Sequence, residues 1–382
     1  MHSKQQKTLA IVGASYLQLP LVERANAMGL RAICFAWPQG AVCKDICDQF
    51  YPISIVNKEE ILAVCRSERI NGITSIASDV AVPTISYVAA SLGLPGNSEE
   101  CAYKATNKGA MRETFSAAGL PCPKFVRVKS TLELPSKAFN YPVIVKPSDR
   151  SGSLGVLKVE TPVDLSPAVE KAIEVSLSKE AIVEEFIANA REVSVEGISW
   201  DGDYHFLTIT DKVTTGSPHF VELEQHQPAI LPPGILDEMR SIVEAAVKAL
   251  GVTYGATHAE LMLTPDNRIY ITEIGARMGG DFIGSDLVLI STGYDFVKGV
   301  IQCALGDFVP PVTATVASSG VFFASSETKD VRAYIANKHK SDAVIRMART
   351  GEPLDVPLAS SGERDGYIIY QAQRRINNIK EL

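Results

Sequence analysis

Short apolar runs alternate with longer amphipathic stretches over the first hundred residues. The apolar runs have the length and composition of buried strands, and the stretches between them have the spacing of helices. In chain order these segments are 8–15, 19–29, 31–37, 59–70, 72–78 and 83–93. Strands that alternate with helices predict a parallel sheet with crossover helices. We therefore expect an α/β, Rossmann-like domain over residues 1–105.

The pattern changes after a helix predicted at 108–119, which Gly119 terminates. The next apolar runs resemble strands that pair mostly antiparallel, and they lie at 141–148, 181–187, 192–200 and 204–210. An amphipathic helix follows, with apolar side chains at 235, 236, 239, 242, 243, 246, 247 and 250. The sequence predicts a second domain over 106–306 and a separate α+β piece over 307–382.

Composition narrows the class of protein. The 382 residues exceed what one core usually holds, and the net charge of −7 disfavours nucleic acid or an anionic membrane as partner. We recognise neither a secretion signal nor an apolar run of membrane-spanning length. Seven cysteines are scattered, and Cys43 and Cys47 lack a second pair that would complete a zinc site. These features predict a cytoplasmic enzyme with reduced thiols.

The first glycine after a predicted strand is Gly13, and it raises the question of a dinucleotide site. Such a site needs G-x-G-x-x-G and an acidic residue at the end of the next strand. Only Gly13 is in place, and the second strand ends at Ala36, Trp37 and Pro38. The residues favour a tight strand-to-helix turn over a nicotinamide oxidoreductase.

A second glycine-rich segment, "VIVKPSDRSGSLGV" (143–156), combines a lysine with a polar loop between two strands. The backbone N–H groups of such a loop can enclose phosphate oxygens, and a lysine beside it supplies a point charge. The residues concerned are Lys146, Asp149, Arg150, Ser151, Gly152, Ser153 and Gly155. The segment is not a Walker A loop, and a flexible hairpin with an exposed lysine is the alternative.

Two acidic residues flank a predicted hairpin within "GATHAELMLTPDNRIYITEIGAR" (255–277). If Leu263 pairs with Arg268, then Glu260 lies opposite Ile271 and Glu273 is the next residue on the same face. That face also carries His258, while Ala259, Leu261 and Leu263 point to the core. Diagonal neighbours lie about 7–8 Å apart, a gap that one or two Mg²⁺ ions can bridge. The alternative is a solvent-exposed acidic face. If the pairing is shifted by one residue, the sequence no longer decides whether the two acids share a face.

Arg277 and the pair Gly279–Gly280 follow this strand directly. An arginine here can reach negative charge that develops beside the cation, and the glycines permit close approach of a ligand to the backbone. The combination suits phosphoryl chemistry, in which positioning and charge neutralisation supply most of the catalysis.

These segments resemble the ATP-grasp superfamily. The resemblance rests on "NKGAMRETFSAAGLPCPKF", "YPVIVKPSDRSGSLGV", "AIVEEFIANAREVSVEG" and "HAELMLTPDNRIYITEIGARMGGDF". The forms "EIGARMGG" and "TTGSPHFVELEQHQPA" are most similar to the L-amino-acid ligase branch. The resemblance implies an N-terminal pre-ATP-grasp domain, a two-lobed ATP-grasp fold and a C-terminal α+β subdomain.

The resemblance also implies roles for individual residues. It places ATP phosphates at Lys108, Lys146 and the loop 149–155, adenine at Glu184, Glu185, Phe186 and Ile187, and ribose at Glu192. It implies metal ligands at Glu260 and Glu273, for two Mg²⁺ ions or Mn²⁺, and a catalytic arginine at Arg277. Gly275 departs from the family, in which many relatives carry an asparagine ligand. Homodimerisation is an expectation of the family alone.

The implied reaction is ATP-dependent activation of a carboxylate to an acyl phosphate, followed by attack of an amine. Small-molecule substrates, amino acids foremost, are the expected partners, with Arg277, Gly279 and Gly280 at their site. The polar segment 211–229, which glycine and serine interrupt, suggests an acceptor pocket with Lys212, His219 or His226 near the substrate carboxylate. The alternative is an ordinary loop whose histidines have no role in binding. An ATP-grasp enzyme of purine or carboxylation metabolism and a catalytically silent nucleotide-binding regulator are the competing functions.

Overall fold

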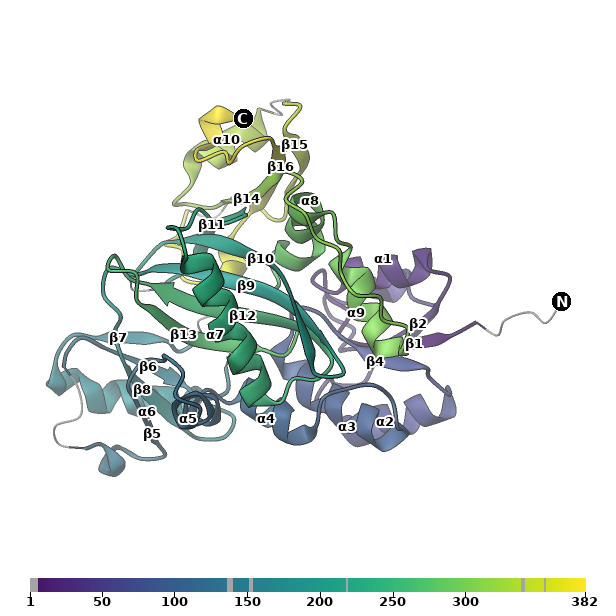
Figure 1. Cartoon of the computed structure of the whole chain (residues 1–382), viewed down its shortest axis with the longest axis horizontal. Coiled ribbons are helices and arrows are strands. Elements are labelled where there is room, and N and C mark those ends of the chain that lie inside the picture. The colour runs from purple at the N-terminus through teal and green to yellow at the C-terminus, as the bar shows by residue number, and fades with distance from the viewer. Residues whose placement is uncertain (1–5, 136–139, 151–153, 218, 338–340, 354) are drawn as a thin grey trace.

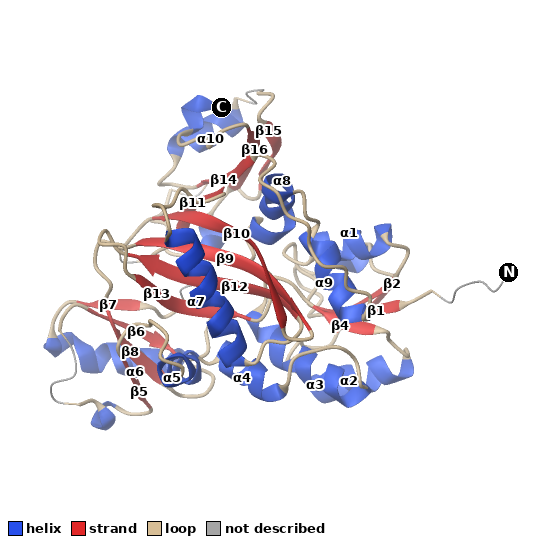
Figure 2. Cartoon of the chain, viewed as in Figure 1, coloured by secondary structure: helices blue, strands red, loops and turns tan. Residues whose placement is uncertain are grey.

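The computed structural model describes residues 6–135, 140–150, 154–217, 219–337, 341–353 and 355–382. Its strands form three sheets, and helices cover their faces (Figures 1 and 2). The α/β and α+β class predicted from the sequence is confirmed.

The N-terminal sheet is parallel, in the order β3-β2-β1-β4. Its strands are β1 (Thr8–Val12), β2 (Arg31–Phe35), β3 (Gln49–Tyr51) and β4 (Gly72–Thr74), and its helices are α1 (Leu19–Ala27), α2 (Lys58–Ser67) and α3 (Val82–Leu92). The predicted crossover pattern is confirmed. The short β3 was not predicted, nor was α4 (Glu99–Thr106), which begins where Ser98 accepts a hydrogen bond from the Cys101 amide.

One face of this parallel sheet is covered by a helix from much later in the chain. Helix α9 (Phe296–Leu305) packs beside α1 on one face, whereas α2 and α3 cover the other. The approach is close, because a Cβ atom at Gly72 would lie 2.5 Å from the Ala304 carbonyl oxygen. The N-terminal domain is therefore joined firmly to the remainder of the chain.

A small antiparallel sheet in the order β5-β8-β6-β7 forms the lobe that carries the glycine-rich loop (Figure 1). Its elements are α5 (Lys108–Ala117), β5 (Phe125–Val128), β6 (Val143–Pro147), β7 (Leu157–Val159), α6 (Leu165–Val175) and β8 (Ala181–Glu185). Helix α6 packs its buried face on this sheet.

The third sheet is antiparallel, with the order β13-β12-β9-β10-β11-β14-β16-β15. Its strands are β9 (Arg191–Trp200), β10 (Asp203–Thr214), β11 (Glu222–Gln227), β12 (Gly255–Leu263), β13 (Ile269–Gly275), β14 (Ser318–Ala324), β15 (Val344–Arg349) and β16 (Gly366–Ala372). Helix α7 (Ile235–Leu250) packs on it through the predicted apolar positions, except Leu236, which is exposed.

Two expectations for this region are corrected. Residues 222–227 form strand β11 rather than part of a broken loop. The strands of the C-terminal seventy residues extend the central sheet through the β11–β14 pairing, so they do not form a separate piece. Main-chain pairing across the sheet joins the two regions.

The remaining helical elements are short. They are α8 (Val288–Thr292), α10 (Lys329–Ala336) and the single turns η1 (Val42–Asp45), η2 (Asp79–Ala81), η3 (Thr131–Glu133), η4 (Pro162–Asp164), η5 (Ile283–Leu287), η6 (Ser361–Glu363) and η7 (Ile379–Glu381). Among the described residues, no single helix has the length and apolarity to span a membrane; the bent pair 283–292 and 296–305, at 113°, passes on length and composition only.

Candidate active site

A cavity of about 210 Å³ lies between the small lobe and the central sheet. It brings together residues that the sequence placed at one site from four separate segments. Lys108, Lys146, Glu184, Glu185, Phe186, Ile187, Glu192, Glu260, Glu273 and Arg277 all line it. Ser151, Gly152 and Ser153 lie outside the described residues. Gly155 has a positive φ of 78°, and its neighbour Val156 lines the cavity.

The two acidic residues of the β12–β13 hairpin face each other directly. Leu263 pairs with Ile269, and an irregularity after Glu260 places Glu260 opposite Glu273. The predicted pairing of Leu263 with Arg268 and of Glu260 with Ile271 is therefore wrong. The shared face is correct, and directly opposed side chains lie closer together than diagonal ones. Ala259, Leu261 and Leu263 belong to the core, as predicted.

Each of the two phosphate-binding lysines predicted from the sequence is paired with an acid. Lys108, which begins α5, donates to Glu273 Oε1 at 2.9 Å and to the Arg150 carbonyl at 2.7 Å. Lys146 on β6 lies 2.7 Å from Glu184 Oε2. Burial lowers the pKa of Lys146, although Glu184 opposes the shift. The alternative of an exposed lysine on a flexible hairpin is excluded, because Lys146 is 8% exposed.

Glu184 is held by two cations at once. Besides Lys146, Arg112 of α5 lies with its Nε 2.6 Å from Glu184 Oε1. Arg112 is fully buried and also donates to the Thr272 carbonyl. Burial raises the carboxyl pKa, but the two cations hold the pKa of Glu184 below its usual value. Both oxygens are thus engaged, and the predicted contact of Glu184 with adenine stays a prediction.

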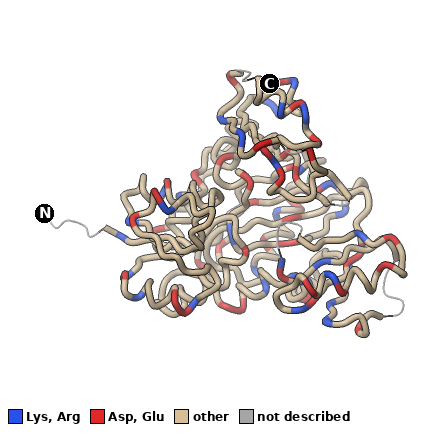
Figure 3. Tube along the Cα trace, turned by 180° about the vertical axis from the view of Figure 1, so that it is seen from behind, with Lys and Arg blue, Asp and Glu red and all other residues tan. Residues whose placement is uncertain are grey.

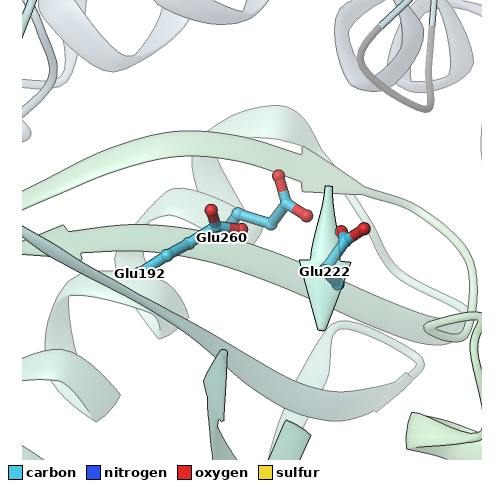
Figure 4. A group of neighbouring side chains, drawn as sticks. All are labelled: Glu192, Glu222 and Glu260. Carbon is cyan, nitrogen blue, oxygen red and sulfur yellow. The ribbon is translucent and has the colours of Figure 1, made fainter. Parts of the chain in front are cut away.

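A buried lysine lies among three glutamates on the same face of the central sheet. The ammonium of Lys212 contacts Glu192, Glu260 at 2.8 Å and Glu222 at 3.4 Å. Figure 4 shows these carboxylates, one oxygen of each lying within 4.8 Å of the others. Burial alone would raise the pKa of Glu260, but Lys212 and His258 hold that pKa well below its usual value.

A buried pair, formed by His258 and Glu196, also contacts Glu260. His258 Nδ1 lies 2.7 Å from Glu196 Oε1, and His258 Nε2 lies 3.4 Å from Glu260 Oε1. Burial opposes protonation of His258, yet Glu196 and Glu260 raise its pKa to about 9. Gly279 makes this pair possible, because a Cβ atom there would lie 2.8 Å from His258 Nδ1 and 3.1 Å from Glu196 Oε2.

Arg277 is fixed by an acid from the N-terminal domain. Its Nε and Nη2 atoms lie 2.8 and 2.9 Å from the two carboxylate oxygens of Asp79. Burial lowers the guanidinium pKa, but Asp79 outweighs it and raises that pKa. Nothing in the sequence signals this partner, since 198 residues separate the two. Gly280 permits the contact between the domains, because a Cβ atom there would lie 3.2 Å from the Ala77 Cβ.

The two histidines proposed for an acceptor pocket lie elsewhere. His219 is exposed and does not line the cavity. His226 is fully buried between Tyr370 and Glu224, to which its ring nitrogens lie at 2.8 and 3.0 Å. The register pairs Lys212 with Gln225, so His226 points to the opposite face. The predicted placement of His226 at the pocket is therefore wrong, and Phe220 and Glu222 line the cavity instead.

The residues present suit a nucleotide with a divalent cation. Carboxylate oxygens of Glu260 and Glu273 are the donors that Mg²⁺ prefers, and both side chains are only partly exposed, at 27% and 22%. Lys108 and Lys146 line the same cavity, and their ammonium groups are suited to bind the phosphates of a nucleotide. Figure 3 shows acidic and basic residues interspersed along the trace of the described residues.

Comparison with known proteins agrees with this geometry. Residues 139–286 match the family model of the ATP-grasp domain. Alanine–anticapsin ligase of Bacillus subtilis is 29% identical over 249 residues, covering 58% of this chain and 51% of the relative. The chain thus spans about half the length of that curated relative.

Solved structures show the same fold over almost the whole chain. The L-amino acid ligase from Bacillus licheniformis superposes with a TM-score of 0.80 at 24% identity, covering 99% of this chain and 95% of that one. Phosphoribosylglycinamide synthetase from Anaerococcus prevotii gives a TM-score of 0.77 at 20% identity, with 98% and 95% coverage. At such identities the likeness establishes the fold alone.

Proposed function

Because the chain contains an ATP-grasp domain, we propose that it is an ATP-dependent carboxylate–amine ligase. It forms an amide or peptide bond through an acyl phosphate and releases ADP and phosphate. The observation that carries this proposal is the convergence of Lys108, Lys146, Glu260, Glu273 and Arg277 on one cavity. Amino acids are the proposed substrates, since the relatives include alanine–anticapsin ligase.

The cavity wall supports a defined placement of ATP. Phe186, Ile187 and Met262 offer apolar surface for the adenine ring, and Glu192 lies near enough to the same cavity to hold ribose hydroxyls. Lys108 and Lys146 then neutralise the phosphates. In this placement each lysine exchanges a carboxylate partner for a phosphate oxygen.

Mg²⁺, when bound by Glu260, Glu273 and the phosphates, supplies charge neutralisation at the transferring phosphoryl group. Two ions, and Mn²⁺ as a substitute, are part of the proposal. Gly275 offers no side-chain ligand. His258 and Lys212 contact Glu260 and orient its carboxylate.

The proposed chemistry has two steps. A substrate carboxylate oxygen attacks the γ-phosphorus, the bond to the ADP oxygen breaks, and an acyl phosphate forms. The amine nitrogen then attacks the carbonyl carbon, phosphate leaves, and the amine loses a proton. Arg277, which lines the cavity beside both acids, stabilises the negative charge that develops on the carbonyl oxygen. We include in the proposal a homodimer and a cytoplasmic location.

The test is a phosphate-release screen on the full-length protein with ATP, Mg²⁺ and pairs of amino acids. The expected result is ADP and phosphate in equal amounts, dependent on both amino acids, with the dipeptide identified by mass. Turnover that needs a ribonucleotide amine or bicarbonate instead would assign the enzyme to purine or carboxylation metabolism. Nucleotide binding with no turnover under any condition would favour a silent regulator. Glu273→Gln, run in parallel, reports whether the release comes from this site.

A further inference from the structure

The N-terminal domain contributes a side chain to the candidate active site. We propose that Asp79 is a positioning residue for the ligase reaction: it fixes the guanidinium of Arg277, and Gly275 leaves the space that its carboxylate occupies. This inference rests on the proposed function, because it assigns to Arg277 the role given there. It assigns to the N-terminal domain a part in the chemistry besides packing.

Asp79 and Arg277 form a bidentate ion pair. Both carboxylate oxygens are used, by Nε at 2.8 Å and by Nη2 at 2.9 Å. Such a pair fixes the plane of the guanidinium as well as its distance. Within the described part of the chain, Nη1 makes one hydrogen bond, donated to the Met278 carbonyl at 3.3 Å. One edge of Arg277 is therefore held, and the other keeps hydrogen-bonding capacity for a reacting group.

The absence of a side chain at position 275 is explained by Asp79. A Cβ atom on Gly275 would lie 2.8 Å from Asp79 Oδ1 and 3.2 Å from Arg277 Nε. The backbone φ of Gly275 is outside the left-handed region, so conformational freedom does not require a glycine. Space for the ion pair is the remaining physical reason for a glycine at the end of β13.

Asp79 is itself held in place by the loop that precedes it. The Ala77 amide donates to the Met278 carbonyl at 3.1 Å, and Ala77 has a left-handed φ of 56°. The buried Gln18 side chain donates to the Ile76 carbonyl at 2.7 Å. The loop is thus tied both to the first turn of its own domain and to the segment after β13. Because this loop is anchored at two points, the Asp79 side chain can hold the Arg277 guanidinium in a fixed position.

The competing explanation is that the Asp79–Arg277 ion pair only holds the N-terminal domain against the later chain. Another ion pair between the same two regions provides a matched control. Arg24 of α1 lies 3.2 Å from Asp295, beside the start of α9, and this pair also joins the N-terminal domain to the later chain. Neither Arg24 nor Asp295 is among the residues that line the candidate active-site cavity. If Asp79 acts only as a tie, then Asp79→Ala and Arg24→Gln should both leave kcat unchanged.

The experiment compares wild type, Asp79→Asn, Asp79→Ala and Arg24→Gln, using an amino-acid pair that wild type turns over. For Asp79→Ala we expect kcat to fall about 100-fold, with ADP affinity and the KM for ATP within threefold of wild type. Asp79→Asn should fall less, and Arg24→Gln should keep wild-type kcat. Asp79 also lines a cavity of about 400 Å³ that reaches Lys108 and Glu273. Formate should enter there and restore part of the activity of Asp79→Ala without stimulating wild type.

A double-mutant cycle tests the role given to Gly275. Gly275→Ala alone should lower kcat, whereas adding it to Asp79→Ala should lower kcat little further, because the contact is already lost. Retention of kcat within threefold in Asp79→Ala would overturn the proposal. A fall in kcat that formate does not relieve and that adds fully to Gly275→Ala would also overturn it.

Failure of the proposed function would look different. In that case wild type itself would turn over no amino-acid pair. The positioning role is then decided by a crystal structure of Asp79→Ala: a displaced Arg277 guanidinium supports it, and an unmoved guanidinium overturns it.

Discussion

The ammonium of Lys108 lies 2.9 Å from a carboxylate oxygen of Glu273, although 165 residues separate them in the chain. It is one of several ion pairs that balance the charge of the cavity. Lys146 with Glu184 and Lys212 with Glu260 follow the same rule. A bound cation and a triphosphate would therefore exchange partners with existing charges, and removal of one member leaves the other uncompensated.

Loss of a central charge should abolish turnover. For Glu273→Gln and for Lys146→Ala we expect ADP formation to fall by at least about 100-fold, because the first removes a charged ligand of the proposed cation and the second removes a positive charge that the reacting phosphates need. Coupled-enzyme detection of ADP measures this. Lys104→Ala is the control, since Lys104 forms an ion pair with its exposed helix neighbour Glu100 and does not line the cavity. Wild-type rates in either test variant would remove the corresponding assignment.

The buried Arg112 should matter for stability. Its side chain is fully buried against Glu184, so Arg112→Ala removes one of the two cations that hold this buried carboxylate and leaves a void. We expect the free energy of unfolding to drop by about 3–5 kcal/mol, as for other broken buried pairs. Urea titration followed by circular dichroism measures it. Arg268→Ala removes an exposed pair with Asp266 and should cost less than about 1 kcal/mol. Equal losses in the two variants would contradict the assignment.

Gly279 should tolerate no side chain. The added methyl group of Gly279→Ala would lie 2.8 Å from His258 Nδ1, so it must displace the imidazole from Glu196. Because His258 also contacts Glu260, we expect kcat to fall about tenfold or more. Gly351→Ala, where a Cβ atom meets nothing within 4 Å, should behave as wild type. Steady-state kinetics of both variants are the measurement, and unchanged kcat in Gly279→Ala would show that the loop adjusts.

The stability of the metal-free protein should decrease at alkaline pH. Glu196 and Glu260 raise the pKa of His258 from 6.5 to about 9 in the folded state, against the effect of burial. A raised pKa stabilises the fold fully below pH 6.5, and this contribution is lost as pH rises through 9. The shift corresponds to about 3 kcal/mol at most.

Urea unfolding between pH 6 and 9.5 in the presence of EDTA checks this dependence. His258→Asn should show a flatter profile between pH 7 and 9 than wild type. A profile for the variant that is parallel to that of wild type would mean that His258 does not carry the dependence.

The sequence by itself determined the local elements and the composition of the site. The alternating apolar runs predicted the parallel sheet, since burial of both faces imposes that pattern. The hairpin predicted around 264–267 brought Glu260 and Glu273 to one site, and the glycine-rich segment after Lys146 was identified as a candidate phosphate-binding loop. These properties depend on residues close together in the chain.

Only the tertiary structure decided the partners of these residues. The irregularity after Glu260 changed the pairing of β12 with β13 and brought the two acids directly opposite each other. The contacts of Arg277 with Asp79 and of Lys212 with three glutamates join segments far apart in the chain. His226 was misplaced because its side of β11 depends on the neighbouring strands. Side-chain periodicity is a property of one segment, whereas register and ion pairing depend on how several segments pack together.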